Sequence, residues 1–219
     1  MTAVDEELFE AVTEDDLDAV RDCLARGANV ETVTEGETPL MFASHDAGIE
    51  MVDLLLEHGA NANARGDEGW GPLAFAAQEG RLDVVERLLA AGADPKTATD
   101  DGRTALHLVA RFGTDAEVAT ALLDAGTPID APDAGAMTPL HVACRYGTTD
   151  VVELLLARGA AIDARCAEGT TPLIRAAISG SPSCVELLLR HGADRTARCD
   201  DGKTAGEWAK RPDIVAMLA

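Results

Sequence analysis

The sequence is poor in aromatic residues and in lysine. Only 3% of its 219 residues are Phe, Trp or Tyr. A buried core must therefore be built from Leu, Val, Ile and Ala, and small aliphatic residues in this quantity favour closely packed helices. Of the 18 basic residues only three are lysines, and 39 acidic residues leave a formal net charge of −21. Nucleic acids and anionic membranes need a basic surface, so we expect neither as a partner.

The acidic excess has more than one explanation. It would steer a basic protein partner towards the chain. Acidic side chains on solvated helix faces would equally serve solubility, and a salt-rich cytoplasm would select the same composition. The sequence leaves these three explanations open.

Secretion and membrane signals are also missing. Residues 1–11 contain four acids and no basic segment followed by an apolar one, so no signal peptide is visible. No apolar run approaches the roughly 18 residues that span a bilayer. The five cysteines are an odd number without a paired framework, which suits a reducing compartment. We therefore predict a cytoplasmic location, with the nucleus as the other compartment that fits.

Sequence motifs of catalysis are missing as well. The chain has no nucleophile elbow, phosphate-binding loop, dinucleotide fingerprint or His-Glu-x-x-His motif. The nearest glycine cluster, residues 66–71, is expected at a hairpin and does not follow a strand. Acids are numerous but scattered over predicted helix faces, without a convergent pair. We therefore predict that the chain is not an enzyme, and we assign no catalytic, cofactor-binding or metal-binding residue.

The positive signal is an internal repeat. Thr38-Pro39-Leu40 recurs at steps of 33 or 34 residues, in phase with a Gly-Ala series and with an apolar helix pattern. The recurrences are Gly71-Pro72-Leu73, Thr104-Ala105-Leu106, Thr138-Pro139-Leu140, Thr171-Pro172-Leu173 and, weakly, Thr204-Ala205-Gly206. These in-phase copies cover essentially the whole chain.

Each part of the repeat has a physical explanation. The threonine hydroxyl suits a helix N-cap, where it accepts backbone N–H groups, and the proline suits the first helical turn. Apolar residues at helical spacing supply a buried stripe. A glycine follows each second helix, where a positive φ is wanted. The polar segment after it predicts a β-hairpin. The glycines are Gly59, Gly92, Gly126, Gly159 and Gly192.

The 33-residue period and the signature Thr138-Pro139-Leu140-His141-x-Ala143 resemble the ankyrin family. The resemblance implies an all-α, ankyrin-repeat solenoid of stacked helix–turn–helix–hairpin units. We predict a single domain over residues 1–219. Its segments are a capping repeat (1–36), internal repeats (37–69, 70–102, 103–136, 137–169 and 170–202) and a truncated C-terminal cap (203–219). The 103–136 repeat has one extra residue between Gly113 and Val118, where we expect a local bulge and no break in the stack.

The histidine positions favour structural roles. His107 and His141 occupy the fourth position of the ankyrin signature, where the imidazole ties a helix start to the neighbouring hairpin. His58 and His191 occupy one equivalent position beside a glycine. Equivalent positions in adjacent repeats lie about 10 Å apart, too far to share one Zn²⁺.

The cysteines fall into two groups. Cys166 and Cys199 each follow an arginine in a predicted hairpin, one repeat apart, which is too far for a disulfide. We expect two solvent-facing thiols there; the neighbouring arginine would favour the thiolate, so mild redox sensitivity is the alternative. Cys23, Cys144 and Cys184 fall on apolar stripes and are expected in the core.

The resemblance also implies where a partner binds. In ankyrin proteins, partners usually contact the hairpin tips and the ends of the first helices, which form one concave face. Three of the seven aromatics fall on such positions, whereas Phe42, Phe75 and Trp208 match a core Leu position. Aromatics, Met and Arg are enriched at interface anchors. The predicted partner-binding residues are Trp70, Arg103, Arg111, Phe112, Met137, Arg145 and Tyr146. The alternative is that Phe112 and Tyr146 merely pack across the helix turn.

The sequence thus predicts a non-catalytic protein–protein interaction module, a monomer without a cofactor, that binds a protein partner on its concave face. A basic protein that it sequesters or inhibits is one candidate. The alternative is a structural scaffold or self-associating element.

Overall fold

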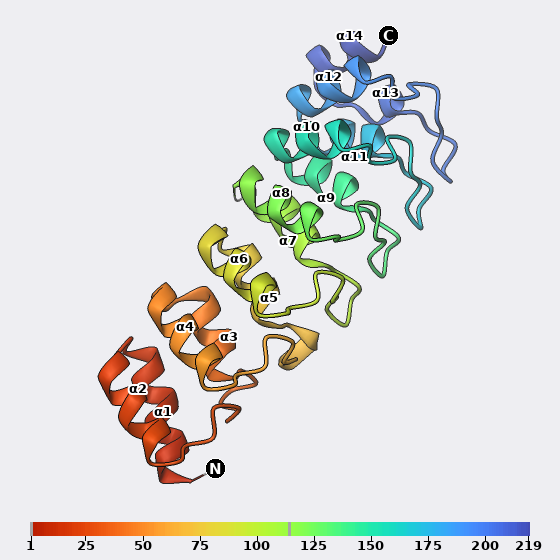
Figure 1. Cartoon of the computed structure of the whole chain (residues 1–219). Helices are drawn as coiled ribbons and strands as arrows, with labels where there is room; N and C mark the ends of the chain where they lie inside the picture. Colours follow the sequence, from red (N-terminus) through yellow and green to blue (C-terminus); the bar gives the residue numbers. More distant parts are fainter. Residues whose placement is uncertain (1, 114) are drawn as a thin grey trace. The chain divides into compact units, whose positions relative to one another are not determined.

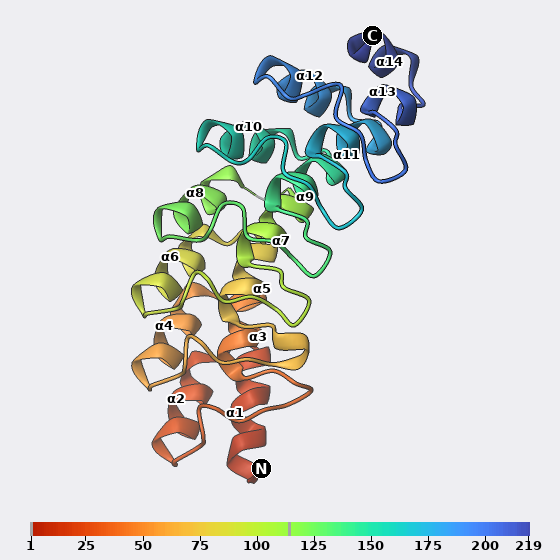
Figure 2. The same ribbon diagram turned by 90° about the vertical axis from the view of Figure 1, so that its right-hand side faces the viewer.

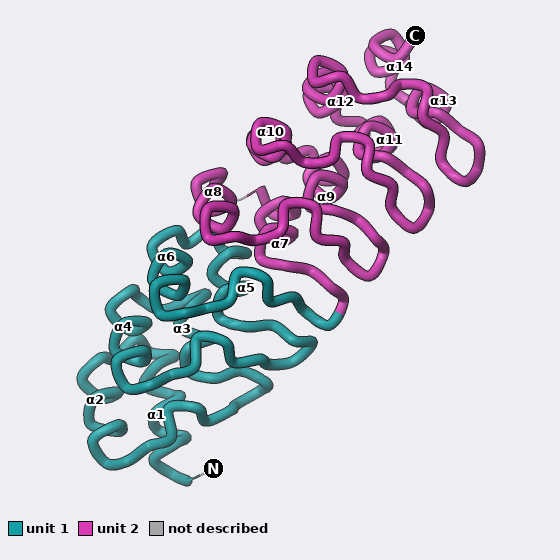
Figure 3. The backbone as a smooth tube through the Cα atoms, turned by 45° about the vertical axis from the view of Figure 1, so that its right-hand side comes forward, with its two compact units in different colours: residues 1–100 teal, residues 101–219 magenta. Residues whose placement is uncertain are grey.

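The structure is a computed structural model that describes residues 2–113 and 115–219. The chain divides into two compact units, Met1–Asp100 and Asp101–Ala219 (Figure 3). The division falls close to the end of the predicted 70–102 repeat. Each unit consists of consecutive helix pairs joined by long loops (Figure 1).

Unit 1 contains three helix pairs. The first helices of the pairs pack on one another as an inner row, and the second helices form an outer row beside them (Figure 2). The inner row is α1 (Ala3–Thr13), α3 (Pro39–His45) and α5 (Pro72–Gln78). The outer row is α2 (Leu17–Ala25), α4 (Ile49–Glu57) and α6 (Leu82–Ala90). A short 3-10 turn, η1 (Asp67–Gly69), precedes α5.

Unit 2 repeats the arrangement with four pairs. Its inner row is α7 (Ala105–Phe112), α9 (Pro139–Tyr146), α11 (Pro172–Ser179) and α13 (Ala205–Trp208). Its outer row is α8 (Ala116–Asp124), α10 (Thr149–Ala157), α12 (Pro182–Arg190) and α14 (Pro212–Leu218). The last pair is shortened, as the predicted C-terminal cap requires.

The helix boundaries follow the predicted caps. Thr38, Thr138 and Thr171 are N-caps with extended backbone, each followed by proline in the first helical turn. The glycine after each second helix has a positive φ, as at Gly126 with 98°. A side chain at that φ would be strained, so these glycines fix where the outer helices end.

The core lies between the two rows and is aliphatic. Leu40, Leu106 and Leu140, which occupy the leucine position of the repeat motif, are completely buried. Cys23, Cys144 and Cys184 are buried as well, which confirms their prediction as small core residues. Alanines such as Ala43 and Ala143 are fully buried on the inner helices, where their small size lets neighbouring helices approach.

The predicted β-hairpins lack regular strands. Among the described residues the one isolated bridge joins Thr34 and Glu37. Other hairpins are closed by a backbone hydrogen bond, as where the Gly66 N–H donates to the Trp70 carbonyl at 2.7 Å. So few paired groups make a turn rather than a ladder. The described chain is therefore helical without strands, which confirms the all-α prediction.

The insertion in the 103–136 repeat lies between α7 and α8. One residue of this loop, Thr114, is outside the described residues, so the expected bulge stays a prediction. On either side, α7 packs against α9 and α8 against α10. Within unit 2 the stack continues past the insertion, as predicted.

None of the helices in the described part of the chain has the length and apolar composition needed to cross a bilayer.

Candidate binding surface

The predicted partner-binding residues belong to both units. Trp70 lies in unit 1, and the other six lie in unit 2.

Four of the six residues in unit 2 form one contiguous cluster at the C-terminal ends of α7 and α9. The guanidinium carbon of Arg111 lies 5.0 Å from the Phe112 ring centre and 5.7 Å from the Tyr146 ring centre. The guanidinium carbon of Arg145 lies 5.7 Å from the same Tyr146 ring. Two neighbouring repeats are thus linked by cation–π contacts through one tyrosine.

The cluster is open to solvent and continues onto α11. Phe112 is 47% exposed and Tyr146 48%. Ile178, which lies in the last turn of α11 at the place of Arg111 and Arg145, is 43% exposed. Ile178 is absent from the predicted set because aliphatic residues carry a weaker interface signal than aromatics and arginine. We call Arg111, Phe112, Arg145, Tyr146 and Ile178 the helix-end surface.

Arg103 and Met137 lie in the hairpins and not at the helix ends. Both precede their helices and are half-buried. Arg103 forms an ion pair with Asp101 at 2.8 Å. The Met137 backbone is engaged on both sides, because its N–H donates to Asp133 and its carbonyl accepts from His107. These contacts stabilise the hairpins.

His107 and His141 tie each helix start to the next hairpin. The Nδ1 atom of His141 accepts the Thr138 backbone N–H at 3.2 Å, and Nε2 donates to the Thr170 carbonyl at 3.0 Å. His107 makes the same pair of contacts one repeat earlier. Burial lowers the pKa of both imidazoles, and the carbonyl each one reaches opposes the shift only in part. The structural role predicted for these histidines is confirmed.

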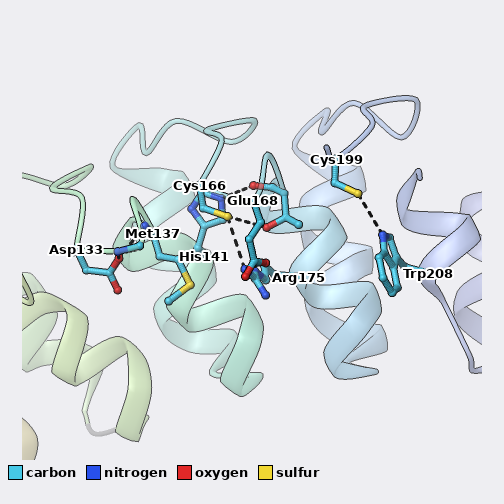
Figure 4. Close-up of polar contacts among 10 residues, drawn as sticks. Asp133, Met137, His141, Cys166, Glu168, Arg175, Cys199 and Trp208 are labelled. Carbon is cyan, nitrogen blue, oxygen red and sulfur yellow. Dashed lines mark hydrogen bonds and ion pairs between the residues drawn. The ribbon is translucent and has the colours of Figure 1, made fainter. Parts of the chain in front are cut away.

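The expectation for Cys166 and Cys199 is wrong, because both thiols are buried. Figure 4 shows their polar contacts. They occupy the hairpin position that Asp133 holds in the 103–136 repeat. The Asp133 carboxylate accepts the N–H groups of Gly135 and Met137 at 2.8 and 2.9 Å. The cysteine sulfurs take the same inward place in their own hairpins. A hairpin residue pointing inward satisfies backbone donors that would otherwise stay unpaired.

Each buried thiol also has side-chain partners. The Cys166 sulfur lies 2.9 Å from the Thr170 hydroxyl and 3.6 Å from an Arg175 nitrogen, which also binds Glu168 at 2.7 Å. Burial raises the pKa of the Cys166 thiol, but its hydrogen bonds from Thr170, the Glu168 backbone and Arg175 together bring it below the usual range.

In the last hairpin the Trp208 indole N–H donates to the Cys199 sulfur at 3.3 Å, and this contact chiefly lowers the pKa of the Cys199 thiol. The Lys203 ammonium lies 4.3 Å from the centre of the Trp208 ring. Trp208 is half-buried and covers the hairpin, so its expected place in the core is wrong.

Unit 1 carries an aromatic row that the sequence interpretation missed. Phe42 and Phe75 are half-buried instead of lying in the core. Ring centres follow one another from Phe9 to Phe42 at 6.0 Å, to His45 at 4.9 Å and to Phe75 at 5.1 Å. Trp70 ends the row, 5.2 Å from Phe75. The recurrence of Phe at one repeat position, Phe42 and Phe75, is the signal that could have revealed it.

A cavity of about 530 Å³ opens beside the end of this row. Two aromatic rings and four carboxylates line it, together with one amide. The lining residues are Glu35, Glu37, Asp67, Glu68, Trp70, Phe75 and Gln78. Carboxylates beside the face of a tryptophan suit a cationic side chain, which gains from both.

The remaining polar residues offer no metal-binding arrangement in the described residues. No group of three or more His, Cys, Asp or Glu there is placed to hold a metal ion. His58 is occupied by a contact of its Nδ1 atom with the Leu54 carbonyl at 2.8 Å, at the end of α4.

Comparison with known proteins agrees with this architecture. A family model described as ankyrin repeats (3 copies) matches residues 8–99, 92–166 and 161–219. The crystal structure of the human ASB11 ankyrin repeat domain superposes with a TM-score of 0.86 and 31% sequence identity, and 96% of each chain is covered.

A curated relative matches over a shorter stretch. The ankyrin repeat, SAM and basic leucine zipper domain-containing protein 1 of Atelerix albiventris is 42% identical over 59 residues. That stretch is 26% of this chain and 12% of the relative. Ankyrin repeats are general protein–protein interaction modules. The signature, the paired helices and these matches together show that the chain belongs to the ankyrin-repeat family.

Proposed function

We propose that this chain is a non-catalytic module that holds a protein partner through the helix-end surface of unit 2. One observation carries the proposal. Of the five large apolar side chains exposed in the described chain, Phe112, Tyr146 and Ile178 lie in the last turns of three successive inner helices. Contiguous exposed apolar side chains on a soluble protein mark an interaction site, whereas scattered ones need no explanation.

The partner is proposed to have a basic rim. The net charge of −21 raises the rate at which a basic protein approaches. The acidic aromatic cavity of unit 1 offers a place for a Lys or Arg side chain beside Trp70 and Phe75. A basic protein held in this way would be sequestered or inhibited.

The test uses a partner recovered from the native lysate with the full chain and then purified. The test variant combines Phe112→Ser, Tyr146→Ser and Ile178→Ser. It should bind the partner at least tenfold more weakly, because truncating an interface anchor costs about 2 kcal/mol or more of binding free energy. The matched control replaces the other two exposed apolar residues, Val33→Ser and Val215→Ser, and should change the affinity little. Titration calorimetry measures both.

Equal affinities of the two variants for the partner would remove the helix-end surface from the proposal. Trp70→Ala tests the cavity of unit 1 separately, since it removes one aromatic wall. A mass that rises with concentration in light scattering would favour the self-associating scaffold instead.

A further inference from the structure

Almost all the arginines of this chain are paired with its own carboxylates or backbone carbonyls. Of the 15 arginines in the sequence, eleven form ion pairs with carboxylates. Arg81 and Arg195 instead donate to backbone carbonyls, of Ala43 at 2.8 Å and Ala219 at 3.0 Å. Arg111 and Arg145 alone have neither kind of partner among the described residues.

These two exceptions are neighbours. They occupy equivalent places on α7 and α9, and both guanidinium groups contact the ring of Tyr146. Two like charges on one ring repel each other. In a chain with 39 acids the absence of a carboxylate here is informative, because an acidic side chain could have paired with either cation at little cost.

The contacts with aromatic rings leave hydrogen-bonding capacity unused. A guanidinium carries five N–H donors in a planar fork that matches a carboxylate. Contact with a ring face holds the group in place without supplying an oxygen to its donors. Arg145 is exposed and Arg111 is half-buried, so an incoming group can reach both. Phe112 and Tyr146 provide apolar surface on either side for the rest of the incoming segment.

We propose that Arg111 and Arg145 together bind the carboxylate of an Asp or Glu side chain on the partner. In the partner segment this acidic residue is flanked by apolar side chains, which pack on Phe112 and Tyr146. The inference rests on the proposed function and adds the chemistry of the partner segment: an acidic residue at its centre, within the basic rim that suits the surrounding surface. A carboxylate is favoured over a phosphate because a monoanion is repelled less by a chain of net charge −21.

The structural alternative is that both arginines serve their own helices. Each lies in the last turn, where a cation interacts favourably with the helix dipole. That role would affect helix stability and would give no dependence on a carboxylate in a ligand. Binding, measured with and without the ligand carboxylate, therefore separates the two roles.

The probe is a random dodecapeptide library displayed on phage and selected on the full chain. Each acidic residue of a selected peptide is then changed to its amide, and affinities are measured for three proteins. These are the unmodified chain, the variant Arg111→Gln with Arg145→Gln, and the control Arg158→Gln with Arg190→Gln. The control removes the same charge from two arginines of unit 2 that already have carboxylate partners.

We expect an acidic residue flanked by apolar ones to recur among the selected peptides. Its amide replacement should weaken binding about tenfold or more on the unmodified chain and on the control, which is the effect of removing one partner of a charged hydrogen bond. On the Arg111→Gln, Arg145→Gln variant the replacement should have no effect.

The outcomes separate the two proposals. Peptides that depend on Phe112, Tyr146 and Ile178 but not on a carboxylate would overturn this inference and leave the proposed function standing. Peptides insensitive to both sets of substitutions, or a selection without binders, would count against both. A phosphoserine that binds more tightly than the glutamate it replaces, and only when both arginines are present, would overturn the assignment to a carboxylate.

Discussion

Mild acid should destabilise unit 2 through its two buried histidines. In the folded chain Nδ1 of His141 faces the Thr138 N–H and Nε2 faces the Thr170 carbonyl. A second proton would place a donor against a donor, and burial also disfavours the charge. The pKa of each imidazole is therefore lowered in the folded state. In the unfolded chain histidine takes up a proton as the pH falls through about 6.5.

The sign and size of the effect follow from proton binding. Just below pH 6.5 the unfolded state binds more protons, so the free energy of unfolding falls as the pH falls. The stabilisation is complete above the unfolded pKa and is lost as the pH falls from there towards the lowered folded pKa. The maximum slope is about 1.4 kcal/mol per pH unit for each imidazole. His107 and His141 together can therefore cost up to about 3 kcal/mol between pH 7.5 and 5.5.

The assay is urea unfolding at pH 7.5, 6.5 and 5.5, followed by Trp208 fluorescence. In a Trp70→Phe background Trp208 is the only tryptophan, so the fluorescence reports the unfolding of unit 2. A separate signal for unit 2 is needed because a repeat array need not unfold in one step. The comparison protein carries His107→Gln and His141→Gln, which cannot titrate. It should start less stable and lose less with acid. Equal losses in both proteins between pH 7.5 and 5.5 would refute the reasoning.

Two further predictions use the same fluorescence assay. Cys166→Ala should lower the free energy of unfolding by about 1–2 kcal/mol, since it removes a buried hydrogen-bonding partner. Cys166→Asp should recover stability, because Asp133 fills the equivalent hairpin position with a carboxylate. A Cys166→Asp protein no more stable than Cys166→Ala would contradict this. Leu106→Ala, at a completely buried side chain, should cost about 2–5 kcal/mol, and a loss below about 1 kcal/mol would mean that the inner row collapses around the vacated space.

Local structure was predictable from the sequence. The threonine caps, the prolines of the first turn, the glycines with positive φ and the aliphatic stripes were all placed correctly. Such features depend on residues within about one helical turn, so a repeated spacing encodes them directly. The roles of His107 and His141 came from the resemblance to the ankyrin signature, which already implies a contact with the next repeat.

The environments of individual side chains needed the tertiary structure. Cys166 and Cys199 were expected in solvent and are buried, whereas Phe42 and Phe75 were expected in the core and line an open aromatic row. The burial of each of these side chains depends on the conformation of its hairpin or on the side chains of the adjacent repeat that pack against it.

The ion pairs of the arginines could not be predicted from the sequence either. Composition gives the excess of acids, but it does not reveal that Arg111 and Arg145 have neither a carboxylate nor a carbonyl partner among the described residues and meet at Tyr146. The sequence by itself determined the repeating helical framework, because that framework is set by short-range spacing. Which side chains remain available to a partner was decided only by the packing of one repeat against the next, since those contacts join residues some 33 positions apart.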